Sequence, residues 1–295
     1  MLSCPIPAQE SAPGGSCCRL SLLHKGSRQR VRRYPSDTTD TQWALIDRLL
    51  PDPAWLAGRG GRPETHCRRQ VVDAIFYVVD NGIKWRALPA DFPPWSTVYN
   101  FFAGWAADGV THALLDILRD RVRLSEGRAA APTAAIIDSQ SVKAAETVWR
   151  STRGYDAGKK INGTKRHIAV DTLGLLICVL VTAANIQDRD GARPLLDKLA
   201  ATCHRVRHVW ADGGYAGKLL TWAKTTLTIT IQIVKRSDDM TGFVVLPRRW
   251  VVERTLAWIT RHRRCARDYE GLPHHHEAMV HWAMIRIMSR RLART

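Results

Sequence analysis

The apolar residues of this chain change their spacing once along the sequence, and this change limits the folds that the chain can adopt. Between 37 and 124 they recur every three to four positions, as in 68–80, which is typical of amphipathic helices. After 132 they form short continuous or alternating runs, such as 175–182, which indicate strands. We therefore predict an all-helical region followed by a region that contains a sheet.

The helical region is expected to hold helices over 41–50, 68–80, 97–105 and 111–123. Asp40 and Ser96 stand where an N-cap is expected, because their short polar side chains can accept a hydrogen bond from the first helical turn. Two short helices separated by a turn are compatible with a helix-turn-helix. A generic helical bundle is the alternative.

The second region predicts a mixed sheet covered by helices. Strands are expected over 134–137, 165–171, 175–182, 207–211 and 227–234, and helices over 188–199, 218–226, 248–265 and 277–291. The predicted organisation is a disordered basic tail over 1–33, a helical domain over 34–125, a linker over 126–132 and an α/β domain over 133–295. The tail is either a DNA-contacting arm or a dispensable extension.

Charge indicates the kind of partner. The chain has 44 Lys and Arg against 27 Asp and Glu, a formal net charge of +17, which implies a polyanionic partner. The apolar stretch 173–184 is shorter than the roughly 18 residues of a membrane span, so no membrane partner is expected. Seven cysteines without a CxxC pair suggest reduced thiols and a cytoplasmic location.

Three carboxylates fall at positions that a sheet can bring together. Asp138 follows the first predicted strand, Asp212 follows the fourth, and Glu253 lies on the long helix 248–265. Converging acids repel each other unless cations lie between them, so this set suggests hard divalent metal ions. Two such ions, Mg²⁺ or Mn²⁺ in its place, would suit phosphodiester chemistry.

Three sequence blocks carry these acids, and they resemble a known family. The blocks IDSQSVK (137–143), WADGGY (210–215) and RRWVVER (248–254) resemble the catalytic blocks of DDE transposases of the insertion-sequence-five family. RRYPSD (32–37), WRALP (85–89) and GYDAGKK (154–160) extend the resemblance, which runs from about 33 to 292. The resemblance implies a ribonuclease H-like catalytic domain with Asp138, Asp212 and Glu253 as its metal-binding triad.

The resemblance also implies an activity. The expected function is an insertion-sequence transposase that binds terminal inverted repeats, cleaves DNA ends and joins the 3′ hydroxyl to target DNA. It would act on the nucleoid, as a homodimer in the DNA complex, with the helical domain recognising the transposon ends. A catalytically inactive, transposase-derived repressor and a ribonuclease H-like nuclease without strand transfer are the alternatives.

Several basic residues are candidates for DNA binding. Arg249 precedes Glu253 by four residues and so shares its helical face, where it can orient the acid or contact a phosphate. The family pattern has a tyrosine and a lysine where this chain has Leu246 and Thr260, and Arg261 is the candidate to replace that lysine. The remaining candidates are Arg254, Lys159, Lys160, Lys165 and Arg166, together with Arg59 and Arg62 of a glycine-rich segment that is either a minor-groove arm or a flexible linker.

Other polar and aromatic residues admit two interpretations. Asp188 and Asp190 are expected to cap a helix, with a metal role as the alternative, and Asp171 is expected to form a turn. The histidines at 274–276 suggest a polar loop before the last helix rather than a zinc site. Tyr215 and Trp250 would either stack on an unpaired base or pack in the core.

Overall fold

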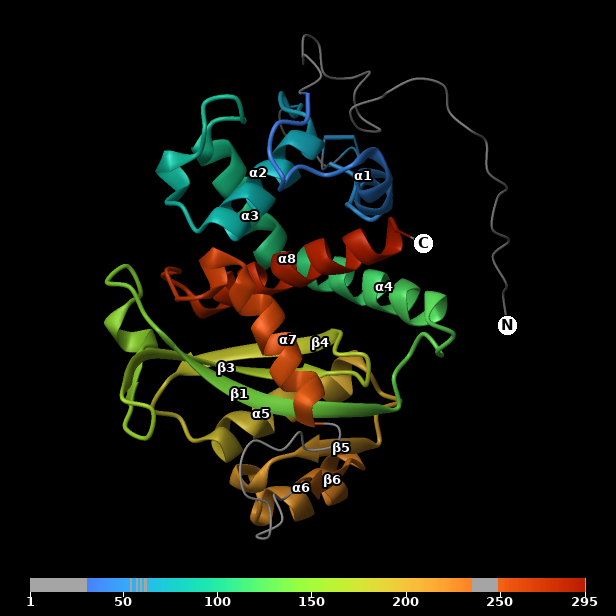
Figure 1. Ribbon diagram of the computed structural model, residues 1–295, viewed down its shortest axis with the longest axis vertical. Helices are drawn as coiled ribbons and strands as arrows, with labels where there is room; N and C mark the ends of the chain where they lie inside the picture. Colours follow the sequence, from blue (N-terminus) through green and yellow to red (C-terminus); the bar gives the residue numbers. More distant parts are fainter. Residues whose placement is uncertain are drawn as a thin grey trace.

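The helices and the sheet form stacked layers (Figure 1). The computed structural model describes residues 31–53, 55–56, 58, 60, 63–234 and 249–294. At one end lie α1 (Asp40–Asp47), α2 (Arg68–Asn81) and α3 (Trp95–Ala107). Beneath them α4 (Val110–Ser125) and α8 (Pro273–Leu292) lie side by side, and the sheet follows below these two helices. The predicted order, helices first and then a mixed α/β region, is confirmed.

Two of the predicted helix N-caps are wrong, one by one residue and the other by two. The N-cap of α1 is Thr39, which forms a capping box with Gln42, while Asp40 lies in the first turn. The helix α3 begins at Trp95 directly after its N-cap Pro94, so Ser96 is already helical. Proline is well suited to this end of a helix, because the backbone donors of the first turn have no intrahelical acceptor.

The sheet is mixed, as predicted. Its strands are β1 (Ala134–Lys143), β2 (Gly154–Asp156), β3 (Ile161–Val170), β4 (Leu176–Ala183), β5 (His208–Ala211) and β6 (Thr230–Ile233). Their order is β2-β3-β1-β5-β6, and β4 pairs with β3. β3 runs antiparallel to its neighbours β1 and β4, whereas β5 runs parallel to its neighbours β1 and β6. The sequence did not predict β2, and β1 continues six residues past its predicted end.

Helices cover both faces of the sheet. α5 (Asp188–Thr202) and α6 (Lys218–Leu227) pack on one face, and α7 (Arg249–Arg261) crosses β1 on the other (Figure 1). The N-cap of α5 is Gln187, so the predicted capping role of Asp188 and Asp190 is wrong; both lie in its first turn. The predicted loop at 274–276 is also wrong, because α8 begins at Pro273 and includes the three histidines.

One apolar core joins the N-terminal helices to the sheet. It contains Phe76 of α2, Leu115 of α4, Trp282 of α8 and Ile259 of α7, and it continues to Ile168 of β3. A second core lies between the opposite face of the sheet and helices α5 and α6. The division into a helical domain and an α/β domain stays a prediction, and the first core crosses the proposed boundary through α8.

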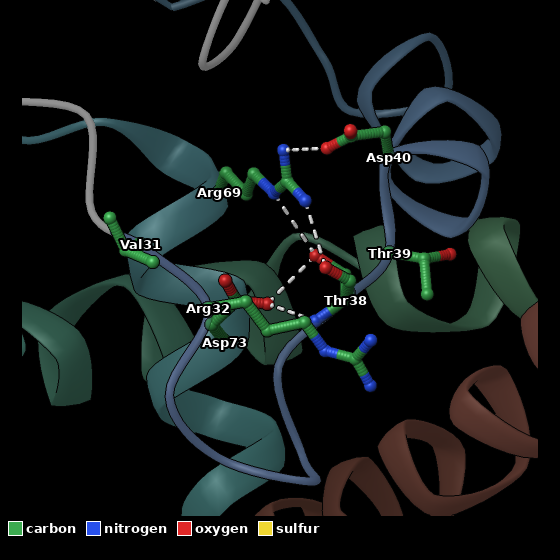
Figure 2. Close-up of a pocket in the computed structure, with 7 residues that line it drawn as sticks. All are labelled: Val31, Arg32, Thr38, Thr39, Asp40, Arg69 and Asp73. Carbon is green, nitrogen blue, oxygen red and sulfur yellow. Dashed lines mark hydrogen bonds and ion pairs between the residues drawn. The ribbon is translucent and has the colours of Figure 1, made fainter.

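A pocket of about 430 Å³ lies where α1 meets α2 (Figure 2). Asp73 accepts hydrogen bonds from the backbone N–H and the hydroxyl of Thr38, both at 2.8 Å. Arg69 contacts the carboxylate of Asp40 at 2.6 Å and donates to the carbonyl oxygen of Thr38 at 2.8 Å. These polar groups hold α1 on α2.

Among the described helices, none has the length and apolar character needed to cross a membrane.

Candidate active site

The sheet places Asp138 on β1 and Asp212 directly after β5, the parallel neighbour of β1. Ile136 of β1 pairs with Trp210 of β5, and each aspartate stands two residues further along its strand direction. Because side chains alternate between the faces of a sheet, both aspartates lie on the face of Ile136 and Trp210. Both of these apolar residues belong to the core under α7. The sequence predicted Asp138 at the end of the first strand, but it lies within β1. The reason is that β1 continues along β3 after β5 has ended.

Glu253 reaches the same face from α7. That helix buries Val252, Leu256 and Ile259 against the sheet and α8, so its first turns lie over β1. The side chain of Glu253 stays 51% exposed. Sequence reasoning predicted this convergence from the three blocks, and the structure brings all three acids to one face of the sheet.

Arg249 lies between two of the carboxylates. Its guanidinium is 3.7 Å from the Asp212 carboxylate and 3.5 Å from that of Glu253, one helical turn away. Asp212 also accepts a hydrogen bond from the backbone N–H of Gly214 at 2.9 Å, which fixes its orientation at the end of β5. The predicted pairing of Arg249 with Glu253 is therefore present, and the same guanidinium reaches Asp212 as well.

The pKa of Asp138 lies above its usual range. Burial, together with the negative charges of Asp212 and Glu253, raises it to about 6. The backbone N–H of Ser139, which donates to Asp138 at 2.8 Å, and the charge of Arg249 act in the opposite direction. The influence of the other two acids shows that the three carboxylates share one electrostatic environment.

No three His, Cys, Asp or Glu side chains lie close enough to hold one metal ion together in the part of the chain that is described. The Arg249 guanidinium contacts both Asp212 and Glu253, so a positive group already lies among the carboxylates. Oxygen ligands from three elements are nevertheless the donor type that Mg²⁺ prefers.

A second ionic group supports the β1 strand beside Asp138. Ser139 and Lys165 both donate to the carboxylate of Asp188 at 2.8 Å. Burial tends to raise the pKa of Asp188, but these two hydrogen bonds and the charges of Lys165 and Lys159 together outweigh it and hold the pKa below its usual range. Asp188 thus fixes the residue next to Asp138, a role that the sequence did not predict.

The remaining predicted DNA contacts differ in their accessibility. Lys159 and Lys160 are exposed in the turn between β2 and β3. Lys165 is buried against Asp188, and Arg166 is 0% exposed and donates to Gln140 at 2.7 and 2.9 Å. The predicted contacts of these last two with DNA gain no support from their positions. Arg59 and Arg62, and also Leu246 and residues 1–30, lie outside the described residues.

On α7, Arg254 and Arg261 occupy different surroundings. The Arg254 guanidinium lies between the rings of Trp250 and Trp258, at 4.4 and 4.6 Å, and donates to the carbonyl oxygen of Leu173. Arg261 points into a groove beside α8. The spacing of Trp250, Arg254 and Trp258, four residues each, was the available sequence signal for this stack.

The two aromatic candidates also separate. Tyr215 is buried in the core between the sheet and α5 and α6, which agrees with the packing interpretation. Burial and the charge of Asp138 raise its pKa well above the usual value. Trp250 is 41% exposed beside Arg249. Asp171 forms the predicted turn, accepting from the backbone N–H groups of Leu173 and Leu175 at 2.9 and 2.8 Å.

Comparison with known proteins identifies the family of this chain. The family described as "Transposase DDE domain" matches residues 129–288, more than half of the chain, and includes all three acids. The family described as "Putative transposase of IS4/5 family" matches residues 38–115. The chain belongs to the DDE transposase family, and the resemblance inferred from its sequence blocks is confirmed.

Two relatives come from one insertion element of Burkholderia cepacia. The chain is 31% identical over 132 residues to the "Putative transposase for insertion sequence element IS402", which covers 42% of this chain and 60% of that protein. It is 30% identical over 111 residues to the "Insertion element IS402 uncharacterized 16.2 kDa protein", covering 36% of this chain and 71% of the relative. The chain thus spans less than two thirds of the first relative.

Proposed function

We propose that this chain is an insertion-sequence transposase that binds terminal inverted repeats, cleaves DNA ends and joins the 3′ hydroxyl to target DNA. The observation that carries the proposal is the convergence of Asp138, Asp212 and Glu253 around Arg249 on one face of the sheet. The net charge of +17 suits DNA, and the mixed sheet with helices on both faces suits a ribonuclease H-like domain.

The carboxylate set fits divalent metal ions in its chemistry. Asp212 and Glu253 already face one positive group, and burial together with their charges makes ionisation of Asp138 less favourable than that of an exposed carboxyl, a cost that bound cations would offset. Asp138, Asp212 and Glu253 would hold the ions. Two bound Mg²⁺ ions would supply activation of a water or 3′ hydroxyl and stabilisation of the leaving oxygen.

The chain's own residues have distinct roles in this proposal. The N–H of Ser139 orients the Asp138 carboxylate, and that of Gly214 orients Asp212. Arg249 offsets the negative charge of Asp212 and Glu253, and it can move to an adjacent phosphate when DNA binds. Two copies acting together on paired ends belong to the proposal, and the mass of the protein–DNA complex in solution tests that part.

The experiment compares Asp138→Asn, Asp212→Asn and Glu253→Gln with the unmodified protein. Each change keeps the size of the side chain and removes one charge, so DNA binding should survive while cleavage in Mg²⁺ falls by several orders of magnitude. Glu146→Gln is the matched control, because Glu146 is exposed outside the site. End binding, nicking and strand transfer are measured in parallel on a labelled duplex that carries the element's end.

Each outcome separates one function from the others. Nicking at the unmodified level by the Glu253 variant would contradict the triad. Cleavage without joined product would favour a nuclease. Binding without cleavage by the unmodified protein would favour a repressor.

A further inference from the structure

A row of alternating tryptophan and arginine side chains runs along α7 away from the carboxylates. Arg254 lies between Trp250 and Trp258, and Arg291 of α8 lies over the opposite end of the row, 4.7 Å from the Trp258 ring. Trp250 directly follows Arg249, which contacts Asp212 and Glu253. The row therefore connects the active site to the junction of α7 and α8.

The row ends in a groove of about 580 Å³ between α7 and α8. We call it the arginine groove, after Arg261, Arg290, Arg291 and Arg294, which line it together with Trp258. The acidic residue among its lining residues is Asp80, whose carboxylate already contacts His262 at 2.6 Å and Arg286 at 2.5 Å. Arg286 thus offsets the charge of Asp80, and the four arginines leave the groove positively charged.

The arginines of the groove have few partners of their own. Arg290 donates to the carbonyl oxygen of Pro35 at 2.9 Å. No ion pair of Arg261, Arg290 or Arg294 occurs among residues whose positions the structure describes. Like charges in one groove repel each other, and a ligand that carries several negative charges along its length would relieve this repulsion.

We propose that the arginine groove binds consecutive backbone phosphates of the DNA duplex on which the active site acts. This inference rests on the proposed function. The eight residues from Glu253 to Arg261 span about 12 Å of helix. That length corresponds to roughly three to four base pairs, so one duplex can reach both the carboxylates and the groove. Because the arginines come from α7 and from the C-terminal end of α8, several positive groups on separate segments line the groove, and a polyanion suits them better than one small anion.

Another explanation assigns these arginines to the stability of α8. Arg290, Arg291 and Arg294 lie at its C-terminal end, where positive charge offsets the helix dipole. This explanation predicts a lower melting temperature for variants that lack the charges, and no specific change in DNA binding.

The test uses full-length protein and a short fluorescent DNA duplex of random sequence, with affinity measured across a series of salt concentrations. In the groove variant Arg261, Arg290 and Arg294 are changed to Gln; in the control variant the exposed Arg205, Arg207 and Lys224 are changed to Gln. Each phosphate contact contributes about 0.9 to the slope of log affinity against log salt. The groove variant should lose roughly two to three from this slope, and the control variant well under one.

A third variant, with Arg261→Lys, Arg290→Lys and Arg294→Lys, keeps the charge and should retain most of the slope. Equal slopes for the groove and control variants would overturn the inference, as would a lower melting temperature with an unchanged slope. If the unmodified protein binds no DNA, the proposed function fails as a whole. If it binds DNA and the groove variant has the same slope as the unmodified protein, the groove inference alone fails.

Discussion

Asp73 is a buried carboxylate whose ionisation the fold disfavours. Burial raises its pKa to about 6, although Thr38 donates two hydrogen bonds to it. As the pH falls through this value, the folded protein takes up a proton that the unfolded chain takes up only near pH 4. Acidification over this window therefore adds stability through Asp73, and the contribution is lost again as the pH rises through 6.

The test substitutes Asp73→Asn, which keeps an oxygen acceptor for Thr38 and removes the titration. Relative to the variant, the unmodified protein should gain about 2 kcal/mol between pH 7.5 and pH 4.5. Free energies of unfolding from denaturant titrations at both pH values give this difference. Asp197→Asn, an exposed change on α5, is the control and should show none. An equal difference at both pH values would contradict the buried titration.

At the scale of residues, the sequence predicted the acids better than their surroundings. Asp138, Asp212 and Glu253 stand in recognisable blocks, and their residue types indicate the chemistry. Such blocks do not show whether a positively charged side chain is buried or exposed. Lys165 and Arg166 read as a basic surface, yet their positions on the central strand β3 bury both side chains. Only the pairing of β3 with β1 and β4 places them inside.

Contact between α5 and β3 depends on a glycine. A Cβ atom at Gly191 would lie 2.3 to 2.8 Å from the ring atoms of His167 on β3, which is too close. Gly191→Ala should therefore destabilise the protein by about 1–3 kcal/mol, because helix or ring must shift. Thermal and denaturant unfolding measure the effect.

Gly104 of α3 provides the matched control. A Cβ atom there would meet no atom within 4 Å, so Gly104→Ala should stabilise the protein by about 0.5–1 kcal/mol through its helix propensity. The two substitutions are chemically identical and should have opposite signs. Stabilisation at both positions would show that α5 does not pack on His167 in this way.

At the scale of elements, periodicity predicted those segments whose apolar faces meet a core. It found α2 and α4, and it found the paired strands β3 and β4. It ended β1 too early, because the residues after Asp138 are mostly polar. Ser139 and Ser141 are nevertheless buried, with hydroxyl groups that donate to Asp188 and Asp156. These acids come from distant segments, so no local pattern indicates the longer strand.

For the whole molecule, α8 connects the N-terminal helices to the rest of the fold. Trp282 is 0% exposed and packs against Phe76 of α2 and Trp105 of α3, with ring centroids 5.7 and 5.9 Å apart. Arg286 donates to Asp80 and to the carbonyl oxygens of Ser36 and Pro35. The sequence suggested a separate helical domain because the period changes near 125, but α8 returns to this region from the opposite end of the chain.

A fragment of residues 34–125 should not fold cooperatively by itself. Without α8 it would expose the apolar residues that meet Trp282, so we expect weak, non-cooperative helicity and no selective DNA binding. A peptide of residues 271–294 added in trans should restore cooperative melting, because it supplies the missing face. The same peptide with Trp282→Ala, which removes about 3–5 kcal/mol of buried packing, should not. Circular dichroism melts of the three samples make the comparison, and cooperative melting of the fragment alone would show that the helical region folds independently of α8.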